Sequence, residues 1–190
     1  MEGLAPEHIA DILTDTFGEK IQGTVLDSAH PHVRVRPDAW PEVAKFLRGD
    51  PRMKFNMLRC ISSVDQLEDD RFEAVYDLDC MLGETNGPKN WSRPQNVSIK
   101  ISVPRSDPHI PSVADVWPAA DWHEREAYDL MGIVFDGHPD SVDTPEGKRP
   151  RRILCPDDWE GHPLRKDYAF PMEYHGIPAV TEYGQTRPVH

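Results

Sequence analysis

The chain has 190 residues, 38 % hydrophobic and 28 % charged, which is the composition of one globular domain and leaves little room for a second core. Its 33 acidic and 21 basic residues give a net charge of -12, which argues against nucleic acid as a partner. No apolar run approaches the roughly 18 residues of a membrane span, no signal peptide is visible, and the three cysteines are widely spaced. We therefore expect a soluble protein of a reducing compartment.

The N-terminal quarter predicts short helices and strands in alternation. Residues 5–17 place apolar side chains at four-residue steps and are followed by a glycine, which is typical of an amphipathic helix. Residues 21–26 and 32–36 are β-like runs, the second with alternating valines. A second helix is expected over 38–48, with Asp38 as its cap.

The next segments predict the main sheet. Residues 55–64 are apolar on both faces apart from two positions, which favours a central strand. Residues 72–82 and 97–103 alternate apolar and polar side chains, and the loop 83–94 would join them as a long hairpin. This order predicts an α+β two-layer domain: a mixed or antiparallel sheet of about five strands, with helices on one side.

Two helical segments are predicted after the sheet, a short one over 112–117 and a longer one over 119–131 that ends at Gly132. Regular structure is not expected beyond that point, because residues 133–190 contain eight prolines and five glycines. The same residues carry scattered aromatic side chains, which a disordered tail would not need. Packing on the chain's own domain and wrapping a partner protein both remain open, and we favour the partner.

The longer helix allows two interpretations of its charged face, which carries Trp122, Arg125 and Asp129. Arg125 lies four residues from Asp121 and from Asp129, the spacing of a solvated ion-pair ladder. An exposed tryptophan beside an arginine is also favoured at protein interfaces. A zinc-protease motif is excluded, because the position of its second histidine is occupied by Ala127.

Glycine-histidine-proline occurs twice, at 137–139 and at 161–163, and turn geometry is the favoured interpretation. A remote alternative is a metal-dependent enzyme that uses His123, His138 and His162. No nucleotide-binding glycine motif, phosphate loop or nucleophile elbow occurs in the chain.

Four motifs together resemble one family, the 30 kDa subunit of respiratory complex I, which is the C subunit of bacterial NADH-quinone oxidoreductase. They are Glu-Arg-Glu with Asp and Gly at 124–132, Gly-His-Pro-Asp at 137–140, Arg-Arg-Ile-Leu at 151–154, and the run from Trp to Tyr at 159–168. Two departures from the family pattern are the extra residues 141–150 and Met131, where an aromatic residue is common.

The resemblance implies a non-catalytic structural subunit of the peripheral arm, whose domain (1–132) is followed by a tail (133–190) that wraps the large quinone-site subunit. It implies that this chain holds no cofactor and that partner subunits carry FMN and iron–sulfur clusters. The complex would be proton-translocating and transfer electrons from NADH to quinone. The chain would lie on the cytoplasmic side of the cell inner membrane as a peripheral subunit. The alternative is the equivalent subunit of a related membrane-bound hydrogenase or other dehydrogenase.

The family signature also supplies the candidate interface residues, which we expect to contact the partner subunit. They are Trp122, Glu124, Arg125, Glu126, Asp129, Gly132, Gly137, His138, Pro139, Asp140, Arg151, Arg152, Trp159, Gly161, His162, Pro163, Leu164, Arg165, Lys166, Asp167 and Tyr168.

Overall fold

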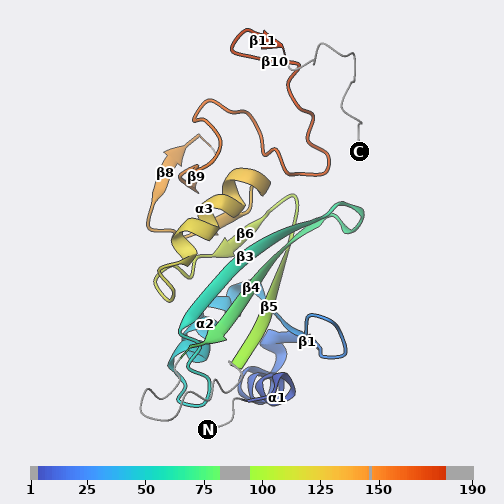
Figure 1. Ribbon diagram of the computed structural model, residues 1–190, viewed down its shortest axis with the longest axis vertical. Helices are drawn as coiled ribbons and strands as arrows, with labels where there is room; N and C mark the ends of the chain where they lie inside the picture. The colour runs from blue at the N-terminus through green and yellow to red at the C-terminus, as the bar shows by residue number, and fades with distance from the viewer. Residues whose placement is uncertain (1–3, 82–94, 146, 179–190) are drawn as a thin grey trace, which may run out of the picture.

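A computed structural model describes residues 4–81, 95–145 and 147–178 and contains a five-stranded mixed sheet (Figure 1). The strands are β1 (Ile21–Val25), β2 (His32–Val35), β3 (Met57–Gln66), β4 (Arg71–Cys80) and β5 (Gln95–Pro104). Their order across the sheet is β1-β2-β5-β4-β3, with β2 and β5 parallel and the other neighbours antiparallel. The expected fold class is confirmed.

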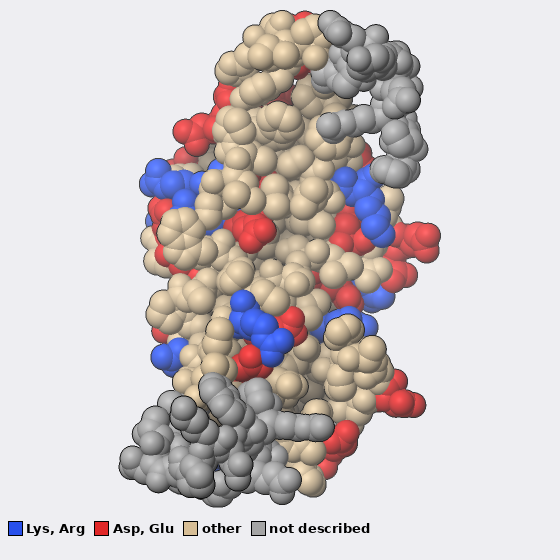
Figure 2. Space-filling model, viewed as in Figure 1, with Lys and Arg blue, Asp and Glu red and all other residues tan. Residues whose placement is uncertain are grey.

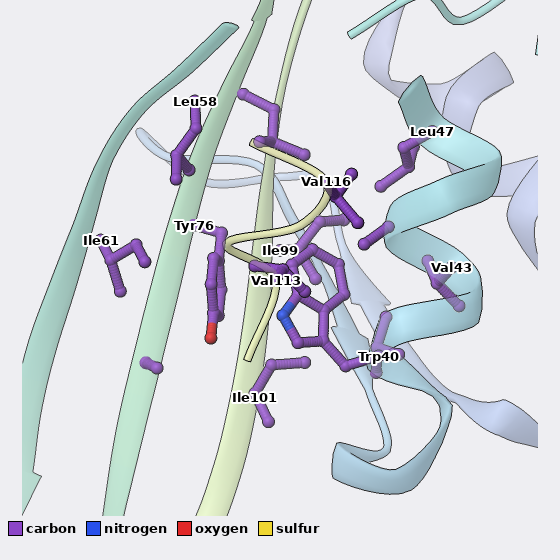
Figure 3. Close-up of a cluster of buried hydrophobic side chains, with 14 of the residues drawn as sticks. Trp40, Val43, Leu47, Leu58, Ile61, Tyr76, Ile99, Ile101, Val113 and Val116 are labelled. Carbon is purple, nitrogen blue, oxygen red and sulfur yellow. The ribbon is translucent and has the colours of Figure 1, made fainter. Parts of the chain in front are cut away.

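Three α-helices pack on one side of this sheet: α1 (Pro6–Phe17), α2 (Trp40–Gly49) and α3 (Ala120–Met131). A 3₁₀ turn, Pro37–Ala39, precedes α2, and Asp38 pairs there with Arg36 instead of capping the helix as expected. Figure 3 shows the core between α2 and the sheet, where Trp40 of α2 lies against Tyr76 of β4 with ring centroids 4.5 Å apart.

The two faces of β4 differ as its alternation predicts. Phe72 and Tyr76 are buried on the helix side, whereas Glu73 lies on the other face and pairs with Arg34 of β2 and Lys100 of β5. The polar face is therefore held by ion pairs between neighbouring strands.

The expectation of a central strand over 55–64 is wrong, because β3 lies at the edge of the sheet. Its apolar residues divide between the two faces: Leu58 and Ile61 are buried, whereas Met57 and Val64 are 40 % and 36 % exposed. An apolar run of this length does not by itself distinguish a central strand from an edge strand.

The helix expected over 112–117 is also not formed, because this segment consists of turns between two prolines. The domain also extends past the expected boundary at 132. Strand β7 (Val134–Asp136) pairs in parallel with β6 (His109–Pro111), and Ile133 and Phe135 belong to the hydrophobic core.

The rest of the described chain is extended, with two small hairpins. The first joins β8 (Ser141–Thr144) to β9 (Gly147–Pro150), and the second joins β10 (Glu173–Tyr174) to β11 (Ile177–Pro178), within a tail for which no regular structure was expected. The predicted loop 83–94 and residues 179–190 lie outside the described residues. Within the described residues, no helix is long and apolar enough to cross a membrane.

Candidate functional site

Asp129 on α3 organises the beginning of the tail. Its side chain is fully buried, and Oδ2 accepts hydrogen bonds from the backbone N–H groups of Ile153, Leu154 and Cys155 at 3.0, 2.7 and 2.8 Å. Its other oxygen, Oδ1, accepts from Arg152 Nη1 at 3.1 Å. Burial alone would raise the pKa of Asp129, but these hydrogen bonds stabilise the anion and lower the pKa overall. The Arg-Arg-Ile-Leu motif of the tail is thus held against α3 of the same chain.

Arg125 strengthens the same attachment one turn earlier. Its Nε donates to the carbonyl of Arg151 at 3.0 Å and its Nη2 to that of Arg152 at 3.3 Å. Its charge pairs with Asp140 at 3.4 Å, so the interpretation of Arg125 as the centre of an ion-pair ladder along α3 is wrong. The guanidinium lies 5.1 Å from the ring of Trp122, which is 61 % exposed.

The second half of the tail motif covers the C-terminal end of α3. A helix leaves its last four carbonyl groups without intrahelical donors, and here all four have one. Tyr128 O accepts from Gly132 N (2.7 Å), Asp129 O from His162 Nδ1 (3.0 Å), Leu130 O from Leu164 N (3.0 Å) and Met131 O from Arg165 Nε (2.7 Å). The segment around His162 and Arg165 is therefore a cap supplied from about 30 residues further along the chain.

Gly132 makes this cap possible. It ends α3 in the left-handed conformation, with φ +76°, which glycine adopts without strain. A Cβ atom at this position would lie 2.3 Å from Arg165 Nη2 and 2.5 Å from His162 Cδ2. The glycine is thus required both for the turn and for the close approach of the tail.

Glu124 lies on the opposite face of α3, in a second buried cluster. Its carboxylate accepts from Ser112 Oγ at 2.5 Å and from Val113 N–H at 2.8 Å. The fully buried ring of His138 brings Nε2 within 3.9 Å of this carboxylate and within 3.1 Å of the carbonyl of Asp121. Burial raises the pKa of Glu124 to about 7.

A third cluster ties the tail to the sheet. The carboxylate of Asp65, on β3, pairs with Arg105 and also accepts the backbone N–H of Lys166 at 2.9 Å. Arg105 in turn pairs with Asp167 at 2.5 Å. Because the Asp65 side chain is 1 % exposed, burying this carboxylate without these partners would be costly.

The structure thus brings most of the signature residues together, and the contacts that they make here are between α3 and the tail of the same chain. Of the other signature positions, Trp122 and Glu126 lie on α3 and the rest lie on the adjoining tail, where Tyr168 donates to the carbonyl of Glu160 at 2.9 Å and closes the turn at Gly161. Sequence reasoning missed Asp65, Arg105 and Ser112, whose partners are distant in sequence. The one available signal was a charged residue at an inward-facing strand position.

The histidines of the metal alternative each have a different partner. His138 and His162 contact backbone carbonyls of α3, and His123 lies 4.0 Å from Glu126. Over the described ranges 4–81, 95–145 and 147–178, no three His, Cys, Asp or Glu side chains are grouped so that they could hold a metal ion.

Comparison with known proteins gives a consistent set of relatives. A family model described as "Respiratory-chain NADH dehydrogenase, 30 Kd subunit" matches residues 33–174. The NADH-quinone oxidoreductase C subunit of Chloroherpeton thalassium is 41 % identical over 167 residues, 87 % of this chain and 62 % of the relative. That of Chlorobium phaeobacteroides is 39 % identical over 168 residues, 88 % of this chain and 90 % of the relative. The chain therefore spans less than two thirds of the first relative.

Two solved structures share the fold. A trypsin-resistant fragment (1-134) of Nqo5 superposes with a TM-score of 0.57 at 28 % identity, over 70 % of this chain and 98 % of the fragment. A chain of the membrane-bound sulfane sulfur reductase, an archaeal respiratory membrane complex, gives a TM-score of 0.63 at 23 % identity, over 86 % of this chain and 85 % of that one.

Proposed function

The chain belongs to the family of the 30 kDa subunit of respiratory-chain NADH dehydrogenase, and on that basis we propose that it is a non-catalytic structural and assembly subunit of a proton-translocating NADH-quinone oxidoreductase. It sits in the peripheral arm, on the cytoplasmic side of the cell inner membrane, and docks on the large quinone-site subunit. Partner subunits carry the FMN and the iron–sulfur clusters, and the whole complex transfers electrons from NADH to quinone.

The observation that supports docking is the distribution of exposed apolar side chains. Of the eleven large apolar side chains exposed in the described residues, six lie on α3 and the tail. They are Trp122, Leu154, Leu164, Phe170, Met172 and Ile177, between 49 % and 70 % exposed. The end of the described tail, which carries β10 and β11, projects away from the five-stranded sheet (Figure 1), so the apolar side chains there have little of the sheet to pack on. Such a set is typical of a surface that another protein covers.

The charged signature residues divide into two roles in this proposal. Arg125, Asp129 and Arg152 fix the tail on α3, as their contacts within the chain indicate. Glu126 and Arg151 have side chains 51 % and 57 % exposed, so a partner can reach them, and Arg151 also pairs with Asp140 of its own chain. Figure 2 shows acidic and basic side chains interspersed over the viewed face, so a mixed polar rim around apolar contacts is the interface that this surface suits.

The test is a pull-down of the tagged full chain, at native expression level, from detergent-solubilised membranes, followed by mass spectrometry. We expect recovery of the quinone-site and iron–sulfur subunits. Recovery of NADH- and FMN-binding partners distinguishes NADH-quinone oxidoreductase from a related hydrogenase or dehydrogenase, since the fold also occurs in a sulfane sulfur reductase complex. A chain that stays alone in the soluble fraction would refute the proposal.

Single substitutions locate the docking surface. Trp122→Ala should reduce partner recovery about tenfold or more, as truncation of an interface tryptophan typically does. Met172→Ala should also reduce it, whereas Met57→Ala, which truncates an exposed methionine on the edge strand, should leave it unchanged. Equal recovery with all three variants would show that the partner does not cover α3 and the tail.

A further inference from the structure

A pocket of about 830 Å³ lies along the tail, between the segment that caps α3 and strand β10. Its volume is within the range of pockets that bind a ligand. Every described residue in its lining belongs to the tail. The lining combines the rings of Trp159, Tyr168 and Tyr174 with four carboxylates. Aromatic rings beside carboxylates are the surroundings that favour an organic cation.

The aromatic rings are held in place by contacts within the tail. The rings of Trp159 and Tyr174 lie 5.1 Å apart at an angle of 52°. The hydroxyl of Tyr174 donates to Asp158 at 2.8 Å, and that of Tyr168 donates to the carbonyl of Glu160 at 2.9 Å. Ring faces that are fixed in this way suit a guanidinium, because it is planar and stacks on them as well as being attracted by its charge.

Two of the four carboxylates already have partners. Asp167 pairs with Arg105 at 2.5 Å, and Asp158 lies 2.5 Å from Nε2 of His175. The other two, those of Glu160 and Glu173, are exposed, and within residues 4–81, 95–145 and 147–178 neither makes an ion pair. These two carboxylates are therefore available to a ligand.

Arg165 also lines the pocket, but its charge is offset by carboxylates nearby. Asp65 and Asp167 both pair with Arg105. Burial and the charge of Arg105 lower the pKa of Arg165, and the charges of the same two carboxylates oppose this shift. Two carboxylates thus act on two guanidinium groups there, and the negative charge of the two unpaired glutamates remains.

Trp159 adds a donor without an acceptor. Its Nε1 is buried and has no hydrogen-bond partner within the part of the chain that the structure describes. An indole N–H group can only donate, and a buried donor that lacks an acceptor is unfavourable. A peptide segment bound against the tail would offer backbone carbonyl oxygens as acceptors, whereas a metal cation would offer none.

We propose that this pocket receives an arginine side chain from an extended segment of the partner protein that covers the tail. The guanidinium would stack on the aromatic rings and pair with Glu160 and Glu173, and a carbonyl group next to it would accept from Trp159. Met172, which is 69 % exposed, lies between the lining residues Pro171 and Glu173 in the sequence, so the pocket continues the apolar surface proposed for docking. The inference rests on the docking function and adds one specific contact to it.

The first test measures partner recovery by the tagged full chain that carries both Glu160→Gln and Glu173→Gln. Both side chains are exposed, so the double variant should fold as the wild type does. Glu7→Gln is the matched control, because Glu7 is exposed on α1, at the other end of the molecule from β10 (Figure 1). We expect the double variant to lower recovery of the large partner subunit about tenfold, and the control to change it less than about twofold. Equal recovery by the two variants, with the partner recovered by the wild type, would overturn the pocket inference and leave the docking function in place.

The second test uses the purified full chain without its partner. Nuclear magnetic resonance follows the indole N–H signal of Trp159, identified by its loss in Trp159→Phe, during titration with N-acetyl-arginine methylamide. The citrulline analogue, which has a similar shape and no charge, should bind about tenfold more weakly, and the double variant should lose the same preference. Equal binding of the two analogues, or an unchanged preference in the double variant, would overturn the pocket inference. A wild-type chain that prefers the arginine analogue but recovers no partner would support the pocket and refute the docking function.

Discussion

Replacing Glu124 by glutamine should change how stability depends on pH. In the folded state the pKa of Glu124 is raised to about 7, whereas that of an ordinary glutamate is 4.5. Between these two values the folded chain binds more protons than the unfolded chain, so the free energy of unfolding falls as the pH rises. The cause is burial of a carboxyl group whose hydrogen-bond donors, Ser112 and Val113, are neutral.

The magnitude follows from the size of the pKa difference. Each pKa unit corresponds to about 1.4 kcal/mol, so the Glu124 contribution should decrease by about 2–3 kcal/mol between pH 5 and pH 8. Glutamine fills the same space but does not titrate. The free energy of unfolding of the wild-type protein should therefore fall by about 2–3 kcal/mol relative to that of Glu124→Gln between pH 5 and pH 8. The contribution is largest in acid and is lost as the pH rises through the folded pKa.

The assay is urea unfolding of the full chain at a series of pH values from 5 to 8, followed by the fluorescence of the buried Trp40 and Trp117. Glu126→Gln is the control, because Glu126 is two residues away on the same helix with a half-exposed side chain. It should keep the wild-type pH dependence. Parallel curves for wild type and Glu124→Gln would show that burial does not hold a proton on Glu124 and would refute the reasoning.

Two further substitutions test the attachment of the tail. Asp129→Asn replaces a buried carboxylate that accepts hydrogen bonds from three backbone N–H groups, so it should speed tryptic cleavage after Arg165 by about tenfold or more. The control, Asp143→Asn at an exposed position of β8, should not change the cleavage rate. Equal cleavage of the two variants would argue against the attachment. Gly132→Ala and Gly137→Ala both place alanine at a positive φ, but of the two only Gly132 has other atoms where the new methyl group would lie. In urea unfolding, Gly132→Ala should therefore lower the free energy of unfolding by about 1–3 kcal/mol more than Gly137→Ala does.

Periodicity was sufficient for the sheet and the long helix. Alternation over β4 and β5 identified the buried face correctly, and Gly132 marked the end of α3, because both signals are local. Two of the failures have a common cause. The edge position of β3 and the β6–β7 pair are set by contacts between segments far apart in sequence, which no local pattern records.

The candidate site shows the same limit. The signature motifs were recognisable as residues that belong together, and the family resemblance assigned them to contacts with a partner. The structure shows that Asp129 satisfies backbone groups 24 to 26 positions away, and that Arg165 caps α3 by a bond to Met131, 34 positions before it. An interface and a long-range intramolecular cap draw on the same residue types, so composition does not separate them.

The β8–β9 hairpin begins and ends at neighbouring points of the chain. Arg151 N–H donates to the carbonyl of Asp140 at 2.9 Å, and the two side chains pair at 3.0 Å, so the residues on either side of the hairpin are already neighbours. The intervening residues, 141–150, therefore begin and end at neighbouring points of the structure. This makes the hairpin a natural insertion point: a fluorophore or an epitope placed next to the exposed Pro145 should report on the chain in an assembled complex and leave the cap and the five-stranded sheet intact.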